Sequence, residues 1–96
     1  MKENNCIRNL LKLICLLQNN STDKCLNTRI ISIYKRNGEL LNISNNTFFR
    51  VMNINKTCVT LLILNNDYTS TNQYFTIDIK CIGAIKCIID TYIANL

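Results

Sequence analysis

The hydrophobic residues of this chain change their spacing once, near Arg29, and this change constrains the fold more than any other feature. Before it, apolar residues recur at three- and four-residue intervals: Ile7, Leu10, Leu11, Ile14 and Leu17. That spacing places them on one face of an α-helix. After Arg29, apolar and polar residues alternate in segments rich in β-branched residues, as in half-buried strands. The sequence therefore predicts one helix followed by β-structure.

The helix is expected over residues 5–18 and to be amphipathic, because polar residues such as Arg8 and Lys12 lie opposite the apolar stripe. Strands are expected over these segments: 29–35, 39–43, 47–53, 57–64, 73–80 and 85–93. Asn37-Gly38 favours a two-residue type I′ hairpin turn. Gly83 is consistent with a bend between two strands or with a helical turn, and the strand is the favoured reading of 85–93. The predicted fold is α+β: an N-terminal amphipathic helix followed by a small antiparallel β-sandwich or partial barrel of five to six strands.

Residues 1–96 are expected to form a single domain, with helix and turn in 1–25 and the β-domain in 26–96. A domain of this size buries only about 60–65% of the surface that its unfolded chain exposes. Its hydrophobic core is therefore thin. Covalent bonds, a metal or association with other copies would have to supply further stability.

The residue types argue against an enzyme. The chain has no histidine, no pair of cysteines spaced C-x-x-C, and only two glycines. The usual zinc-ligand spacings, a Cys-His nucleophile pair and a glycine-rich phosphate loop are all missing. The four aspartates are scattered, so no acid/base pair is fixed by local spacing. We therefore expect no catalytic residues, no metal site and no cofactor.

The formal net charge is +5, but only Lys35 and Arg36 are adjacent basic residues. A nucleic-acid binder of this size usually gathers its cations on one face and interleaves aromatic residues. No nucleic-acid partner is therefore expected. The apolar run 10–17 is interrupted by Lys12 and lacks a cleavage pattern after it. It is also too short to span a bilayer, so the expectation is synthesis in the cytoplasm, no export signal and no membrane span.

Cysteines carry the remaining functional signal. Cys6 and Cys15 are nine residues apart, about 180° around a helix, so they cannot bond to each other within it. Cys81 and Cys87 would be about 20 Å apart on a continuous strand, too far for a disulfide, and only a tight reversal around Gly83 would let them pair. Cys58 lies between apolar neighbours and is expected to be buried. Cys6, Cys15 and Cys25 lie in or beside polar segments that are expected to be exposed, which favours crosslinks there. The candidates for disulfide crosslinks are the five cysteines other than Cys58: Cys6, Cys15, Cys25, Cys81 and Cys87.

Four stretches occur in the order found in one protein family: 5–25, 27–38, 48–64 and 70–90. The last is the most specific, with Ser-Thr, then Thr-Ile-Asp, then Cys81, Ala84-Ile85 and Cys87. Together the stretches cover most of the chain. In them the chain resembles the cysteine-rich CotY/CotZ/ExsY spore coat and exosporium proteins of spore-forming Firmicutes.

The resemblance implies a structural protein made in the mother-cell cytoplasm and deposited on the spore coat or exosporium surface. Such proteins assemble, with copies of themselves and with other coat proteins, into disulfide-crosslinked two-dimensional lattices that are often hexagonal, so a hexamer is expected. The chain departs from the family in two ways. Family members usually carry a longer leader, rich in cysteine and histidine, and a longer middle region than this chain has. Gly83 stands where many members have another cysteine. With fewer cysteines for crosslinks, a role in the main lattice layer and a role in an accessory layer are both compatible with the sequence.

Two other functions fit the residues. One is a subunit of a spore appendage or filament, built from head-to-tail contacts between copies. The other is a small secreted binding module stapled by three internal disulfides, for which six cysteines allow fifteen connectivities.

Overall fold

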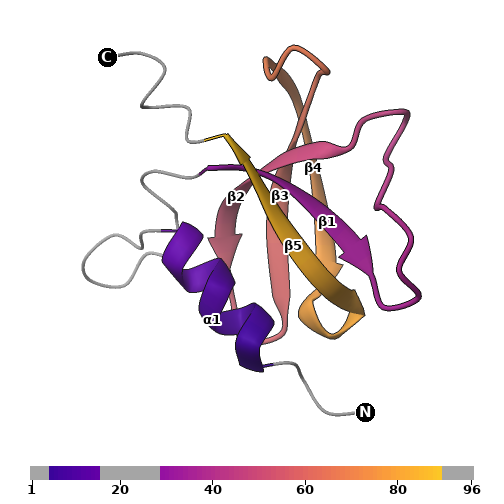
Figure 1. Ribbon diagram of the computed structural model, residues 1–96. Coiled ribbons are helices and arrows are strands. Elements are labelled where there is room, and N and C mark those ends of the chain that lie inside the picture. The colour runs from indigo at the N-terminus through magenta and orange to yellow at the C-terminus, as the bar shows by residue number, and fades with distance from the viewer. Residues whose placement is uncertain (1–4, 16–28, 90–96) are drawn as a thin grey trace.

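The computed structural model describes residues 5–15 and 29–89. In order along the chain, the elements are α1 (Asn5–Ile14), β1 (Ile30–Lys35), β2 (Phe48–Ile54), β3 (Cys58–Leu64), β4 (Ser70–Asp78), the 3-10 helix η1 (Ile79–Cys81) and β5 (Ile82–Ile89). One short helix and an antiparallel sheet make this an α+β fold, as the change of hydrophobic spacing predicts (Figure 1).

The five strands form one sheet in the order β4-β3-β2-β1-β5, and every neighbouring pair is antiparallel. The sheet is open, with β4 and β5 at its edges. The two-sheet sandwich alternative is not present among the described strands, because all of them pair within this one sheet. The short η1 carries the chain from one edge strand to the other.

Helix α1 packs on one face of the sheet, in contact with β2 and β5. Its residues Ile7, Leu11 and Ile14 are buried there, whereas Leu13 points outward with 73% of its surface exposed. Fully buried strand residues such as Phe49 and Leu61 complete this core. Because successive strand residues face opposite sides, the helix covers only one set of them.

A smaller apolar cluster lies on the other face of the sheet. Leu62 and Leu64 alternate with the core residues of β3 and pack there with Ile30. The rings of Phe48 and Tyr68 meet edge to face, with centroids 5.0 Å apart. Strand β3 is therefore buried on both faces, which explains its nearly continuous apolar sequence.

The turn after β1 differs from the expected two-residue hairpin. Gly38 has a φ of +90°, but Asn37 does not adopt positive φ, which a type I′ turn requires. The amide of Lys35 donates to the carbonyl of Glu39 at 2.8 Å, and the amide of Gly38 donates to the carbonyl of Lys35 at 2.9 Å. Arg36 therefore joins the turn as a third residue. Beyond it, the expected strand 39–43 is reduced to two isolated bridges, Tyr34 with Leu40 and Ile43 with Asn46.

Side chains fix this turn from outside. The Nζ of Lys35 lies 3.1 Å from the Oε1 of Glu39. Hydrogen bonds from Lys35 and then Asn37 lower the pKa of the Glu39 carboxyl below its usual value. The carboxylate is fully exposed, so the network specifies the turn more than it stabilises the protein.

Three further boundaries differ from expectation. Strand β4 spans Ser70–Asp78 where 73–80 was expected, because the chain turns into η1 at Ile79. Helix α1 ends at Ile14, and the rest of the expected 5–18 segment beyond Cys15 lies outside the described residues. The last strand begins at Ile82, before the expected 85, and residues 90–93 are not described.

Candidate functional site: the exposed cysteines

The two cysteines of the N-terminal helix have different surroundings. Cys6 is exposed in the first turn of α1. Cys15 directly follows the helix and is completely buried and disulfide-bonded. Nine residues of helix separate them by about 13 Å along the axis, so they do not bond to each other.

Cys58 is the first residue of β3 and is half-buried. The side-chain Oδ1 of Asn55 accepts hydrogen bonds from the amides of Thr57 and Cys58, at 3.0 and 2.7 Å. This Asn-centred turn, a common use of asparagine outside helices and strands, fixes the start of β3. The Cys58 sulfur lies 3.4 Å from the hydroxyl of Thr57.

Cys81 and Cys87 are exposed thiols on either side of one bulge. Cys81 ends η1, which begins after Asp78, whose Oδ1 accepts a hydrogen bond from the amide of Lys80 at 2.9 Å. Strand β5 then runs through Gly83 without reversing. Cys87 pairs with Ile31 of β1, about 16 Å along the strand from Ile82. The reversal that would let Cys81 and Cys87 bond is absent.

Three of these cysteines come from elements that meet at one end of the molecule, which we call the η1 end. It comprises the first turn of α1, the turn 55–57 and η1 (Figure 1). The guanidinium of Arg8 donates to the carbonyls of Asn55, at 3.1 Å, and Lys56, which fixes α1 on this turn. The amide of Ile79 donates to the carbonyl of Thr57 at 2.8 Å. Cys6, Cys58 and Cys81 are thereby brought to the same end.

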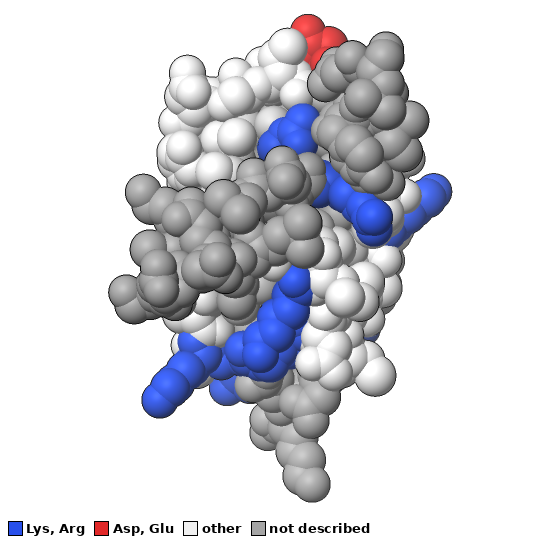
Figure 2. All heavy atoms as spheres, turned by 90° about the vertical axis from the view of Figure 1, so that its left-hand side faces the viewer, with Lys and Arg blue, Asp and Glu red and all other residues white. Residues whose placement is uncertain are grey.

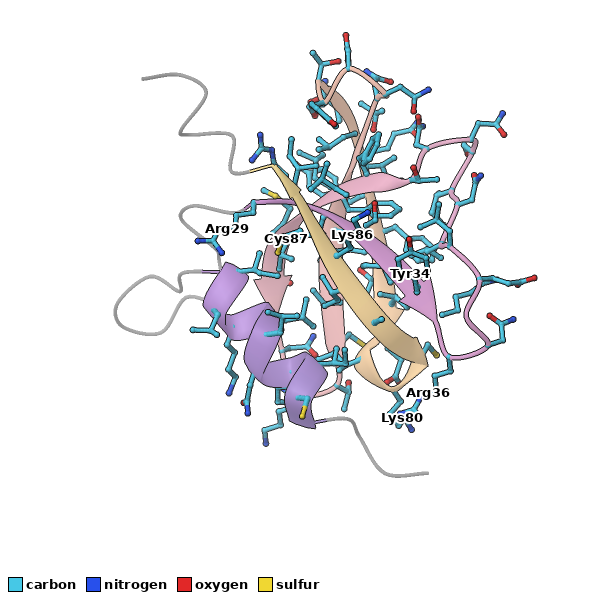
Figure 3. The ribbon with its side chains drawn as sticks, viewed as in Figure 1. Arg29, Tyr34, Arg36, Lys80, Lys86 and Cys87 are labelled. Atoms are coloured by element: carbon cyan, nitrogen blue, oxygen red, sulfur yellow. The ribbon has the colours of Figure 1, made fainter. Side chains whose placement is uncertain are left out.

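Cations surround the η1 end. Lys56 and Lys80 are exposed beside Cys58 and Cys81. Arg36 reaches across from the turn after β1, and its Nε donates to the carbonyl of Lys80 (Figure 3). Lys86 is the corresponding neighbour of Cys87. Figure 2 shows Lys and Arg side chains at several separate places on the α1 side of the molecule, not as one stripe.

The exposed thiols are accessible to other molecules. Within residues 5–15 and 29–89, no three His, Cys, Asp or Glu side chains gather where they could hold a metal ion. Thiol–disulfide exchange needs only an accessible sulfur and a thiolate or disulfide partner. Exposed cysteines at the η1 end and on β5 meet the requirement for access.

Two expectations about the cysteines need correction. Cys15 was expected in exposed, polar surroundings but is buried, because it follows Leu11 by four residues and so falls on the same helix face. Cys58 is half-buried and not in the core, because it begins β3 on the face opposite Val59. Cys25 lies outside the described residues. The contact of Arg8 with Asn55 and Lys56 could not be predicted from the sequence, because 47 and 48 positions separate Arg8 from these two residues.

No helix in the described part of the chain is both long and apolar enough to cross a membrane. No family model, no curated protein and no solved structure matches the chain.

Proposed function

We propose that this protein is a structural subunit of the bacterial spore coat or exosporium, which assembles with copies of itself into a disulfide-crosslinked, hexagonal two-dimensional lattice. It is made in the mother-cell cytoplasm, bonds to other coat proteins as well, and is not an enzyme. The resemblance of its four sequence stretches to the CotY/CotZ/ExsY proteins supports the spore assignment. The η1 linkage between the two edge strands favours the partial-barrel form of the domain.

One observation carries the crosslinking part of this proposal. Cys81, at the end of η1, and Cys87, in β5, are exposed thiols, and the strand between them keeps them too far apart for a disulfide with each other. Because both thiols are exposed, both are accessible to the cysteines of another molecule for disulfide bonding. Such bonds between small domains would offset the thin core.

The free thiols also bear on the secreted binding module as an alternative function. A binding module stapled by three internal disulfides would use all six cysteines, whereas Cys58, Cys81 and Cys87 are thiols here. This favours bonds between molecules. A filament subunit uses the same thiols as a lattice subunit, and images of the assembly distinguish them.

Serine substitutions test which cysteines form the crosslinks. In oxidised protein, we expect a ladder of multimers on a non-reducing gel. Replacing Cys6, Cys58, Cys81 and Cys87 together by serine should largely remove the ladder, because these are the thiols of residues 5–15 and 29–89. At the exposed sites Cys6, Cys81 and Cys87, each substitution should change the free energy of unfolding by about 0.5 kcal/mol or less.

Cys15→Ser is the matched control. It removes a buried, bonded sulfur, so we expect it to lower stability by about 2–5 kcal/mol and to leave the ladder in place under conditions where the variant is folded. A ladder that persists in the fourfold variant, or wild-type peptides linked only within one chain by mass spectrometry, would contradict the proposal.

A further inference from the structure

The two edges of the sheet differ in how they are protected from pairing with another chain. Natural edge strands carry charges, bulges or a covering element that prevents such pairing. Strand β5 has Lys86, bulges at Gly83 and Ile88, and contact with α1. Strand β4 has a bulge only near its start, at Thr71 and Asn72, and no charged residue from 70 to 77. Figure 1 shows α1 against β5, with β4 on the far side of the sheet.

The second half of β4 is accessible. Tyr74 is 59% exposed, and Gln73 and Thr76 are also exposed. Phe75 packs only partly against the core on the α1 side. None of the described strands pairs with the outer edge of β4. A straight, uncharged edge with an incompletely buried phenylalanine is therefore available.

The backbone groups that point outward can be identified from the register. The amide of Ile79 donates to the carbonyl of Thr57 at 2.8 Å, and Cys58 lies opposite Asp78 in the same register. In an antiparallel pair, hydrogen-bonded and non-hydrogen-bonded positions alternate. Residues 77, 75 and 73 therefore direct their N–H and C=O toward β3. Tyr74 and Thr76 direct theirs away from the sheet.

We propose that β4 is the interface at which two copies of this chain pair, antiparallel about a two-fold axis through Phe75. Tyr74 of one copy then lies opposite Thr76 of the other, and each such pair exchanges both backbone hydrogen bonds. Phe75 faces its own counterpart at a non-hydrogen-bonded position, where side chains approach most closely. The two sheets become one continuous sheet.

The absence of charge over residues 70–77 of β4 makes this edge the place where a second copy fits. The protein carries a net charge of +5, so two copies repel each other wherever cations face cations. Contacts between copies through the η1 end, with Arg8, Arg36, Lys56 and Lys80, meet this repulsion and need a covalent bond to hold them. Residues 70–77 carry no charge, so two copies can approach each other along β4 without this repulsion. A two-fold axis makes one strand complementary to itself.

This inference deepens the proposed function and rests on it for the role of the dimer as a lattice contact. The pairing itself needs no disulfide. An experiment in excess reductant therefore tests it separately: crosslinking can fail while the dimer forms, and the dimer can fail while oxidised protein still crosslinks.

Thr76→Lys is the decisive variant, with Asn66→Lys as its matched control. Both add one positive charge at an exposed position, but Asn66 lies in the β3–β4 turn. Sedimentation equilibrium in reductant should show a monomer–dimer equilibrium for the wild type. Thr76→Lys should raise the dimer dissociation constant about tenfold or more, because it places two lysines diagonally across the axis from each other on the same face of the joined sheet. Asn66→Lys should change it less than twofold.

Tyr74→Pro supplies a second test, because it removes an outward amide and no bond to β3. We expect a folded monomer with a cooperative thermal transition. A wild type that stays monomeric at millimolar concentration in reductant overturns the inference. So does a Thr76→Lys variant that dimerises as tightly as Asn66→Lys.

Discussion

Replacing Leu11 by alanine should lower the free energy of unfolding by about 2–5 kcal/mol, the range for a buried leucine whose site cannot collapse. Leu11 is completely buried between α1 and the sheet. A small domain has only about 5 kcal/mol in total at the lower end of the usual range. The variant should therefore be partly unfolded at 37 °C, which urea unfolding followed by circular dichroism would measure.

Leu13→Ala is the control for this prediction. It makes the same chemical change two residues away in the same helix, but Leu13 is 73% exposed. We expect a loss of about 0.5 kcal/mol or less. Equal losses at the two positions would show that α1 does not pack on the sheet through the face described above.

Gly83→Asn should be the second large effect. A Cβ at this position would lie 2.7 Å from the carbonyl oxygen of Lys35 and 3.0 Å from the Cα of Arg36. Both are backbone atoms, so β1 and β5 would have to separate at the bulge. We expect a loss of about 1–3 kcal/mol, as for overpacked sites, measured by thermal and urea unfolding.

Gly38→Asn is the matched control for Gly83→Asn. Gly38 has a φ of +90°, and no atom lies within 4 Å of the place that a Cβ would take there. Asparagine tolerates positive φ better than other side chains. The change at Gly38 should therefore cost less than the change at Gly83. The reverse order would contradict the close approach of Gly83 to β1.

The spacing of apolar residues was enough to predict the helix and most of the strands, because each depends on neighbours in the sequence. The start of α1 and the position of β3 agree with expectation within one residue. The sequence predicted a turn at Asn37-Gly38 correctly but predicted the wrong turn type. Because Lys35 pairs with Glu39, Arg36 is also part of the turn.

The surroundings of the cysteines were harder to predict. The helical spacing from Leu11 contained the signal for burial of Cys15, but the polar residues after it suggested exposure. The order of strands depends on contacts between distant segments, so the sequence could not show that β4 and β5 are the edges. Gly83 pointed to an irregularity, and the structure makes it a bulge within β5.

Electron microscopy of the full-length protein, oxidised and then treated with reductant, tests the central proposal most directly. We predict ordered two-dimensional sheets with hexagonal symmetry under oxidising conditions, and their loss or weakening when disulfides are reduced. A monodisperse monomer under oxidising conditions would contradict the proposal that this chain is a crosslinked lattice subunit.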